Sequence, residues 1–404
     1  MKKVVLAYSG GLDTSFCIPY LTREHKCEVH CLSVNTGGFD EDELAEMEQR
    51  AIQLGAKSFR AINVEESFYK DCIRYLIFGN VLRNDTYPLS VSSERVFQAI
   101  EVAKYAGIIK ADAIAHGSTG AGNDQVRFDL VFAAMAPNCE IITPIRDNGF
   151  SRAHEIEYLN KLGYKWSKEK GAYSVNKGLW GTSVGGKETL TSRHPIPSEA
   201  YPSQIEYFDP SEISIEFNSG ELCAVNDVQM EPVQAIKAIE EIASRYAIGR
   251  DIHVGDTIIG IKGRVAFEAA APLIIIKAHQ LLEKHTLSKW QQHWKKQLGD
   301  WYGMFVHEGQ FQDPVMRDIE AFLRSSQLRV DGIVYIKLYP YRFELQGINS
   351  EYDLMDVPFG KYGEEQGGWT ADDAKGFIKL MGNSSKIYNH KNNNSWEAYP
   401  PDIK

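Results

Sequence analysis

The sequence has few cysteines and no long apolar run. Its 404 residues contain six cysteines, too few for a disulfide scaffold in a chain of this length. Three residues separate the closest pair, Cys27 and Cys31, and no histidine cluster accompanies them. Buried, inert thiols are therefore favoured over a zinc site or a redox motif. The first apolar run stops at Tyr8, too short for a signal peptide or a membrane helix, so we expect a soluble cytoplasmic protein.

Positive charge is also scarce. The 44 Lys and Arg residues against 54 Asp and Glu residues give a net charge of −10 at pH 7. This balance disfavours nonspecific binding to nucleic acid or anionic membranes, but it leaves room for a small basic pocket that holds an anionic metabolite. Ordinary totals of 33 Gly and 15 Pro, with 43% hydrophobic residues, exclude a low-complexity chain and predict two or three domains with cores of their own.

Strands and helices alternate over the first 160 or so residues. The pattern predicts strands at 4–7, 27–35, 59–64, 111–116 and 140–145, and helices at 13–21, 40–54, 65–78, 93–106 and 151–162. Asp40 with Glu43 forms a capping box, and Ser151 is a candidate cap. The alternation indicates an α/β fold with a doubly wound, mainly parallel sheet, which binds ligands at the carboxyl ends of its strands.

A different pattern follows residue 163. Strand-like residues 213–217, helices at 232–246 and 272–285, and a hairpin over 332–346 predict a second, α+β domain. Thr370 and Asp373 form a candidate capping box for a short helix that reaches Met381 and stops at Gly382. An Asn-rich solvated tail is expected from Asn389. We expect three parts: a nucleotide-binding domain at 1–167, a synthetase and multimerisation domain at 168–360, and a C-terminal helix and tail at 361–404, a candidate oligomerisation arm.

The strongest local motif lies between the first strand and the first helix. It reads Ala7-Tyr8-Ser9-Gly10-Gly11-Leu12-Asp13-Thr14-Ser15. The glycines allow close backbone approach, and hydroxyls and free helix N–H groups can donate to an anion. The spacing is neither a Walker loop nor a Rossmann fingerprint, and Asp13 beside phosphates implies Mg²⁺. The alternative is a plain strand-to-helix turn with capping hydroxyls.

A second polar loop follows the strand expected at 111–116. Residues 116–128 contain three glycines together with Thr119, Asn123, Asp124 and Arg127. Asp124 can accept from an ammonium group and Arg127 can pair with a carboxylate, so the loop suits an amino-acid zwitterion. The alternative is a surface loop with an ion pair that contributes almost nothing. His116 is interpreted as a satisfied histidine at a strand end.

These motifs resemble a known family. Residues 9–15 resemble the pyrophosphate-binding loop (PP-loop) of the ATP pyrophosphatases, and residues 119–128 resemble the Thr-Gly-x-Gly-Asn-Asp-Gln-Val-Arg-Phe signature of the argininosuccinate synthase family. The similarity extends to Tyr87-Pro88-Leu89, with Ser92 and Arg95 following, and to Tyr173-Ser174 with Ser183 nine residues later. It therefore covers roughly the first 190 residues and weakens to scattered agreement beyond them.

The resemblance implies an AMP-forming carbon–nitrogen ligase that condenses citrulline with aspartate through a citrullyl-adenylate, with ATP as co-substrate and Mg²⁺. It further implies a homotetramer acting in arginine biosynthesis, with small-molecule substrates and no nucleic-acid or membrane partner. Asp13, Asp124 and Arg127 would be catalytic, and no residue is an obvious nucleophile or dedicated metal ligand. ATP would contact Ala7, Tyr8, Ser9, Gly10, Gly11, Leu12, Asp13, Thr14, Ser15, Asn35 and Gly117. Citrulline would contact Tyr87, Ser92, Asn123, Arg127, Ser174 and Ser183, and aspartate would contact Thr119, Asn123 and Asp124.

The chain departs from the family pattern at several positions. Ala121 stands where the family usually has Lys, and residues 176–178 read Asn-Lys-Gly in place of Asp-x-Asn. Gly255 and Phe267 stand where a Glu and a Tyr commonly help to bind citrulline. Asp256 and Glu268 are the candidate substitutes.

Other readings remain open at this point. A PP-loop adenylating enzyme with a different acceptor, such as an RNA-modifying enzyme, would want a basic groove and paired cysteines, which the charge and the cysteine spacing disfavour. A glutamine-dependent amidotransferase would need an added glutaminase domain, for instance one with Cys at position 2, where this chain has Lys2. An inactive nucleotide-binding module is disfavoured because both loops retain their polar residues.

Overall fold

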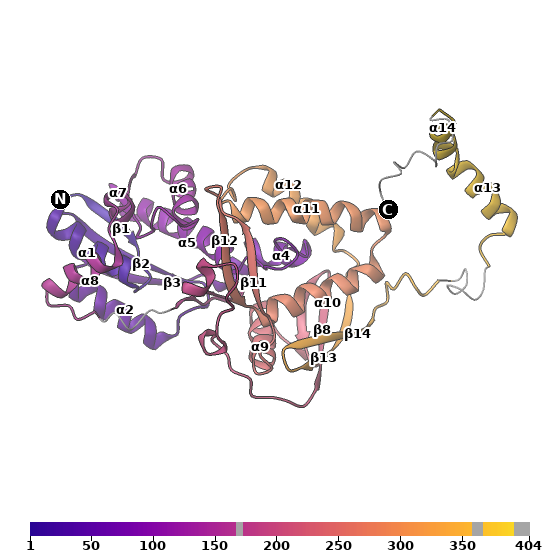
Figure 1. The fold of residues 1–404 in the computed structure, drawn as a ribbon, viewed down its shortest axis with the longest axis horizontal. Helices are drawn as coiled ribbons and strands as arrows, with labels where there is room; N and C mark the ends of the chain where they lie inside the picture. The colour runs from indigo at the N-terminus through magenta and orange to yellow at the C-terminus, as the bar shows by residue number, and fades with distance from the viewer. Residues whose placement is uncertain (167–172, 358–366, 392–404) are drawn as a thin grey trace. The chain divides into compact units, whose positions relative to one another are not determined.

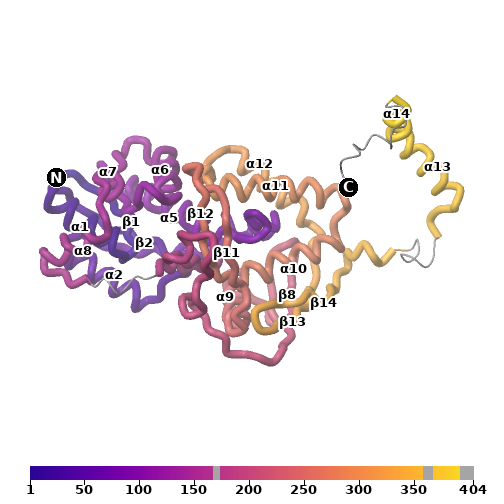
Figure 2. Tube along the Cα trace, in the orientation of Figure 1, coloured from indigo at the N-terminus to yellow at the C-terminus, as the bar shows by residue number. Residues whose placement is uncertain are grey.

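The computed structural model describes residues 1–166, 173–357 and 367–391. The chain divides into two compact units, Met1–Tyr352 and Asp353–Lys404, which are described separately below. The domain boundaries expected at 167/168 and 360/361 lie outside the described residues. Figure 2 follows the chain by residue number.

A five-stranded parallel sheet forms the N-terminal part of the first unit (Figure 1). Its order is β3-β2-β1-β4-β5, so the strands are added to one side of β1 up to β3 and to the other side from β4 onward. All four neighbouring pairs are parallel, which puts the carboxyl ends of β1 and β4 side by side at one edge. The bounds are β1 Lys3–Ala7, β2 Glu28–Asn35, β3 Ser58–Asn63, β4 Ala113–Ala115 and β5 Glu140–Ile142.

Helices cover both faces of this sheet, as the fully buried first strand requires. Val5 of β1 packs into the core that contains the helix Ser90–Ile109 (α5). Val4 and Leu6 face the opposite core, which contains α1 (Leu12–Pro19) and α8 (Arg152–Lys161). The doubly wound α/β fold is thereby confirmed. The remaining helices of this part are α2 Glu41–Gln53, α3 Glu65–Phe68, α4 Arg74–Phe78, α6 Asp124–Met135 and α7 Pro144–Asn148, with π-helical turns η1 Tyr20–Glu24 and η2 Tyr69–Ile73.

Local sequence signals set several of these boundaries. The capping box of Asp40 and Glu43 is confirmed, and the Ser151 side chain accepts from the His154 N–H at the start of α8. The strand expected at 140–145 ends at Ile142, because Pro144 has no N–H for the ladder and instead begins α7. The single helix expected at 65–78 is interrupted by the π-helical turn η2.

Two antiparallel sheets build the rest of the first unit. One has the order β10-β9-β8-β13-β14 and the other β11-β12-β7-β6. The helix expected at 232–246, the helix expected at 272–285 and the hairpin expected at 332–346 are confirmed within a few residues. The strands are β6 Ser174–Asn176, β7 Thr182–Gly185, β8 Ser211–Asn218, β9 Glu221–Val225, β10 Val228–Gln229, β11 Arg250–Asp256, β12 Lys262–Glu268, β13 Gly332–Tyr339 and β14 Arg342–Asn349. The helices are α9 Pro232–Ser244, α10 Ala270–Thr286, α11 Lys289–His307 and α12 Val315–Ser326, with 3-10 turns η3 Lys187–Leu190 and η4 Ser198–Ala200.

Helix α11 joins this part to the parallel-sheet part. Gly299 of α11 lies so close to Gly79, at the end of α4, that a Cβ on Gly299 would meet the Gly79 carbonyl oxygen at 2.3 Å. Nearby, the buried Lys295 pairs with Glu283 of α10 at 2.9 Å. Figure 1 shows the β11–β12 hairpin between the parallel sheet and α10 and α11, and one hydrophobic core runs through both parts.

The second unit contains α13 (Ala371–Met381) and α14 (Asn383–Lys391). The predicted capping box of Thr370 and Asp373 is confirmed. Gly382 ends α13 with an ordinary right-handed φ of −72°, so α14 follows at once. The solvated tail expected from Asn389 begins later than predicted, because residues 389–391 are still helical although residues 390 and 391 are exposed; its remainder lies outside the described residues. Within the described parts of the chain, no helix has the length and apolarity to span a membrane.

Candidate active site

The loop after β1 is shaped by a glycine in left-handed backbone. Gly10 has φ of +73°, and a Cβ there would lie 2.8 Å from Met47 Cγ of α2. The carbonyl oxygen of Gly10 accepts a 2.8 Å hydrogen bond from Arg50 Nη1. Only glycine combines that conformation with that close approach, so the turn into α1 depends on residue type.

Hydroxyl groups surround this turn. Ser9 Oγ and Thr14 Oγ1 lie 3.2 Å apart, and the buried Ser15 Oγ lies 3.5 Å from both the Gly10 carbonyl oxygen and the Tyr8 hydroxyl. The first N–H groups of α1 have no intrahelical acceptor, because no preceding turn exists to supply one. The loop therefore presents backbone and hydroxyl donors together, the arrangement that binds an anion such as a phosphate.

A second carboxyl group accompanies Asp13. Glu155 of α8 is buried, its carboxyl is within hydrogen-bond reach of Asp13, and its Oε2 atom has no hydrogen-bond partner. Burial and then the Asp13 charge raise the pKa of Glu155 to about 8. Sequence reasoning missed Glu155, because it is distant in the chain and carries no local motif.

The second polar loop packs directly on the first. A Cβ on Gly117 would lie 3.1 Å from the Asp13 carbonyl carbon and 3.2 Å from the Thr14 nitrogen. Gln125 Nε2 donates to the Gly120 carbonyl oxygen at 2.6 Å and ties the loop to α6, while Thr119 is exposed. His116 is satisfied by Asp129 at 2.9 Å and by the Ser118 N–H at 3.2 Å, as expected.

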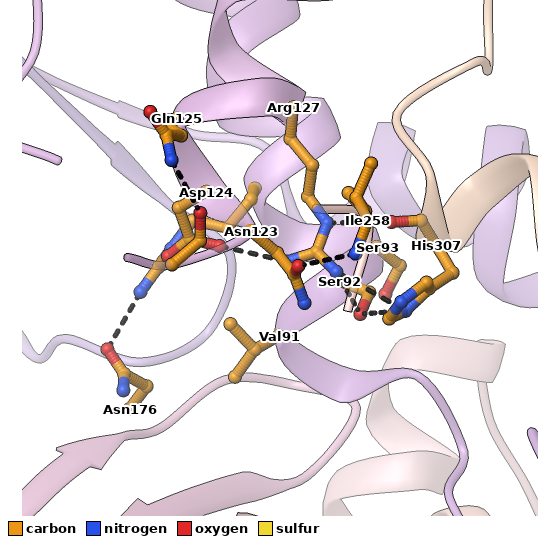
Figure 3. Close-up of polar contacts among 12 residues, drawn as sticks. Val91, Ser92, Ser93, Asn123, Asp124, Gln125, Arg127, Asn176, Ile258 and His307 are labelled. Atoms are coloured by element: carbon orange, nitrogen blue, oxygen red, sulfur yellow. Dashed lines mark hydrogen bonds and ion pairs between the residues drawn. The ribbon is translucent and has the colours of Figure 1, made fainter. Parts of the chain in front are cut away.

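Asp124 lies between two arginines at the start of α6 (Figure 3). Its Oδ1 accepts from Arg127 Nη1 at 2.9 Å and its Oδ2 accepts from Arg95 Nε at 3.1 Å. Burial alone would raise the pKa of Asp124, but the two guanidinium groups outweigh it and lower that pKa below the usual value. Arg95 Nη2 continues the chain of contacts to Asn176 Oδ1 of β6 at 2.7 Å. This carboxylate is held ionised beside fixed cations, unlike a pair in open water.

Arg127 is buried and held on three sides. Besides Asp124, it donates from Nε to the His307 carbonyl oxygen at 2.9 Å and from Nη2 to Ser92 Oγ at 2.9 Å. His307 Nδ1 lies 3.3 Å from Nη2 and 3.2 Å from Ser92 Oγ, and Figure 3 shows its ring beside Ser92. His307 ends α11, which sequence analysis did not identify, so no signal near Arg127 could have pointed to this residue.

The β11–β12 hairpin reaches the same loop. Asn123 Oδ1 accepts a 2.9 Å hydrogen bond from the Ile258 N–H at the hairpin tip (Figure 3). Tyr87 lies under the hairpin, with its ring 5.3 Å from the ring of His253, and its hydroxyl accepts from the Val91 N–H at 3.1 Å. Burial raises the pKa of Tyr87 to about 12, so the phenol stays protonated near neutral pH.

The other residues expected at the site lie around this centre. Ser174 and Ser183 stand on the paired strands β6 and β7, with Ser183 buried and Ser174 exposed. Asn35 ends β2 at the same sheet edge as the first loop. Its Oδ1 accepts from the N–H groups of residues 37–39, so the side chain orders the next turn of the chain.

The positions that depart from the family pattern have defined environments. Phe267 is fully buried with its ring 5.3 Å from Tyr87, and a Cβ on Gly255 would lie 2.7 Å from His253 Nε2. Glu268 is buried and paired with Arg250 at 2.7 Å, whereas Asp256 pairs on the surface with Lys262 at 2.6 Å. Both carboxylates therefore already have a cation of their own, which disfavours either as the substitute for a missing Glu. Ala121 is exposed.

The cysteines and metal-ligating residues are dispersed. All six cysteines are free thiols, four of them buried, and burial raises the pKa of Cys31 well above the ordinary thiol value. Within the described residues, no group of three or more His, Cys, Asp or Glu side chains is placed to hold a metal ion.

Comparisons with known proteins match nearly the whole chain. The family models described as "Arginosuccinate synthase N-terminal HUP domain" and "Arginosuccinate synthase C-terminal domain" match residues 3–165 and 173–388. An argininosuccinate synthase of Dictyoglomus turgidum is 38% identical over 96% of this chain and 97% of its own length. The argininosuccinate synthase of Xylella fastidiosa is 35% identical over 97% of this chain and 98% of its own length. That of Methanocaldococcus jannaschii is 34% identical over 95% of this chain and 97% of its own length.

The two matched regions together span both parts of the first unit and most of the second. Matches of two family models over most of the chain and near-full-length similarity to named enzymes show the family. The chain belongs to the argininosuccinate synthase family, a family of ligases.

Proposed function

We propose that this protein condenses L-citrulline with L-aspartate at the expense of ATP, releasing AMP and pyrophosphate in arginine biosynthesis. The observation that carries the proposal is the contact of Gly117 with the first turn of α1. Through that contact, the anion-binding loop and the zwitterion-binding loop share one edge of the sheet. An α-phosphate on the first loop would therefore lie next to an amino acid on the second.

The chemistry needs alignment more than covalent help. The ureido carbon of citrulline is a poor electrophile, because two nitrogens donate electron density into it. Its oxygen would attack the α-phosphorus of ATP, giving a citrullyl-adenylate while pyrophosphate leaves with the electrons of the broken P–O bond. The aspartate amine would then attack the ureido carbon and AMP would depart. Positioning and charge neutralisation should supply most of the rate enhancement.

We assign the substrates to the residues that the sequence motif suggested. ATP would occupy the loop of residues 7–15, bounded by Gly117 and by the turn that Asn35 orders. Citrulline would lie among Tyr87, Ser92, Asn123, Arg127, Ser174 and Ser183, and aspartate among Thr119, Asn123 and Asp124. Arg127 and Asp124 are already paired, so each ligand charge would be added to a fixed, ordered pair. Preorganisation of this kind lowers the cost of aligning two amino acids.

Mg²⁺ is part of the proposal. Carboxylate oxygens are suitable ligands for this ion, and Asp13 lies in the phosphate loop beside the unpartnered Glu155 Oε2. Asp13 would hold the ion, with ATP phosphate oxygens and water as the other ligands. The ion would neutralise phosphate charge as pyrophosphate leaves.

Product analysis tests the function. With ATP, citrulline, aspartate and Mg²⁺, we expect AMP, pyrophosphate and argininosuccinate in equal amounts. Omitting aspartate should still permit citrulline-dependent exchange of labelled pyrophosphate into ATP. Release of ADP and orthophosphate, or turnover without citrulline, would overturn the proposal.

We also propose that the C-terminal unit mediates assembly, as the family resemblance implies a homotetramer. The α13 side chains Phe377, Ile378 and Met381 are 63–68% exposed, and a second copy of the chain would cover them. Light scattering should give a tetramer for the wild type and a smaller species for Ile378→Asp. An unchanged mass for this variant would exclude α13 from the interface.

A further inference from the structure

Three buried nitrogen atoms near the citrulline side of the site have no hydrogen-bond partner. They are Arg83 Nε, His253 Nδ1 and His307 Nε2. An unpaired buried polar atom costs free energy, so a group of three in one region calls for a ligand that satisfies them. The three residues come from different elements: the turn before Tyr87, strand β11 and the end of α11.

Contacts with the hairpin and α11 fix the Arg83 guanidinium. Its Nη2 donates to the Asp256 carbonyl oxygen at 3.3 Å, and its Nη1 lies 3.6 Å from Met304 Sδ. These contacts leave Nε as the unpaired donor. The carboxylates of Glu308 and Asp256 affect Arg83 through their charges, while these two side chains contact Gln310 and Lys262.

The two histidines are neutral and close to Arg83. Burial and the charges of Arg127, Arg83 and His253 lower the pKa of His307 to about 2, against the opposing effect of the Asp256 backbone. Burial and Arg83 lower the pKa of His253. Because His307 Nδ1 faces the donor Arg127 Nη2, it must accept, and the proton resides on the unpaired Nε2. His307 Nε2 is therefore a donor without a well-formed hydrogen bond, and it lies near the Asp256 backbone, whose carbonyl oxygen accepts from Arg83 Nη2.

His253 fills the space that a longer residue at position 255 would need. A Cβ on Gly255 would lie 2.7 Å from its Nε2, and the imidazole stacks on Tyr87 at an interplanar angle of 25°. Where the family pattern has a carboxylate, this chain therefore has an imidazole. The wall beside Tyr87 presents nitrogen donors, which suit an anion, in place of an acidic group, which suits an ammonium.

We infer that Arg83, His253 and His307 form a subsite for the carboxylate of the acceptor substrate. The inference rests on the proposed function, since it assumes that the acceptor occupies the space by Tyr87 and Ser92. Arg127 is a poorer candidate for this task, because its Nε, Nη1 and Nη2 atoms already donate to His307, Asp124 and Ser92. In this subsite Arg83, His253 and His307 recognise the carboxylate of the acceptor substrate, and the ammonium group of that substrate contributes little to binding.

Binding measured by calorimetry without ATP or aspartate tests the subsite. Three probes differ in one group each: citrulline, citrullinamide, which lacks the carboxylate charge, and 5-ureidopentanoate, which lacks the ammonium. Because charged hydrogen bonds are lost, citrullinamide should bind about tenfold or more weakly. 5-Ureidopentanoate should stay within about threefold of citrulline. Equal affinities for citrulline and its amide would overturn the inference, as would failure of both acids to bind at millimolar concentration.

Variants tie the effect to the named residues. Arg83→Gln should weaken citrulline about tenfold and leave citrullinamide nearly unchanged. His253→Phe keeps the ring on Tyr87 and removes both nitrogens, and it should give a smaller loss of the same kind. Arg342→Gln on the exposed part of β14 is the matched control and should change neither probe. Equal losses for both probes in the two variants would contradict a carboxylate subsite.

The two hypotheses fail separately. If the acids bind through Arg83 but no argininosuccinate forms with ATP and aspartate, the proposed function fails and the subsite stands. If argininosuccinate forms but Arg83→Gln has no selective effect on the acids, the subsite fails and the function stands.

Discussion

The two walls of the site are built in opposite ways. The wall at the parallel sheet consists of two short loops. The polar groups of each loop are close together in the sequence, as between Ser9 and Ser15. The opposite wall is assembled from Arg83, His253 and His307, which are separated by 170 and 54 residues in the sequence. A local loop of the first kind keeps its geometry whatever lies opposite it. Residues of the second wall can therefore be replaced without altering the loop. Their difference shows that local geometry shapes the sheet-side wall, whereas long-range packing shapes the opposite wall.

Asp13 gives the strongest test of the sheet-side wall. Asp13→Ala should lower citrulline-dependent pyrophosphate–ATP exchange by about 10²–10³-fold, the scale of a lost preorganised electrostatic group. Glu155→Gln is the companion variant, because its amide keeps the shape of the Glu155 carboxyl, which is largely protonated at neutral pH, and cannot ionise. An Asp13→Ala enzyme with unaltered exchange would remove Asp13 from the adenylation step.

Two variants distinguish the binding of citrulline from the binding of aspartate. Arg127→Ala should raise the Michaelis constant for citrulline, and Asp124→Ala that for aspartate, each by about 10–100-fold because a charged hydrogen bond is lost. Melting temperatures must be compared, since removing Arg127 leaves the carboxylate of Asp124 short of a partner. Unchanged constants for both substrates would contradict the assignment.

Glu94 of α5 gives a prediction about how the free energy of unfolding depends on pH. It is buried, its Oε1 has no partner, and a Cβ on Gly178 would meet that oxygen at 1.7 Å. Burial, and then Asp124 against the opposing effect of Arg95, raises the pKa of Glu94 to about 8. The folded state therefore keeps a proton that the unfolded state releases near pH 4.5.

The stability that this proton provides is present below pH 4.5 and is lost as pH rises to about 8, by about 1.4 kcal/mol per pH unit. Glu94→Gln should remove that part of the pH dependence of urea unfolding and make the protein more stable than wild type at pH 9. Glu101→Gln, on the same helix but paired at the surface with Lys104, should leave the profile unchanged. Parallel wild-type and Glu94→Gln profiles would show that Glu94 is ionised in the folded state.

The smallest expected effect lies outside both walls. Asp40→Ala removes the cap of α2 and should cost about 1 kcal/mol in the free energy of unfolding without altering turnover. Urea denaturation and a steady-state assay check the two halves of this prediction. Helix α2 carries Met47 and Arg50, which contact Gly10. A loss of activity would therefore mean that the geometry of the loop at Gly10 depends on the stability of α2.

The sequence was informative where one stretch of chain determines its own structure. Buried β1, the capping boxes at Asp40 and Thr370, and the glycine turn at Gly10 depend on residues within a few positions, so their patterns predicted the elements. The helix α11 was missed because Trp290, Trp294 and Trp301 are exposed, which places aromatic residues on the solvent side and obscures the usual amphipathic period. Strands β11 and β12 were missed because glycines and charged residues interrupt their alternation.

The same distinction applies to the candidate site. The two loops could be found from residue types and spacing, and the structure adds that Gly117 brings them into contact. Glu155 and His307 could not be found, because their placement depends on how α8 and α11 pack. No local pattern near Asp13 or Arg127 encodes those helices.

The approach of Gly299 to Gly79 has a mechanical consequence. Backbone meets backbone at this point, because neither glycine has a side chain to separate α11 from the end of α4. Hinges work by taking up dihedral changes in a few residues with space around them, and this seam offers none. A displacement of α11 against α4 at this point would force backbone atoms together, so we expect the two helices to move as one piece.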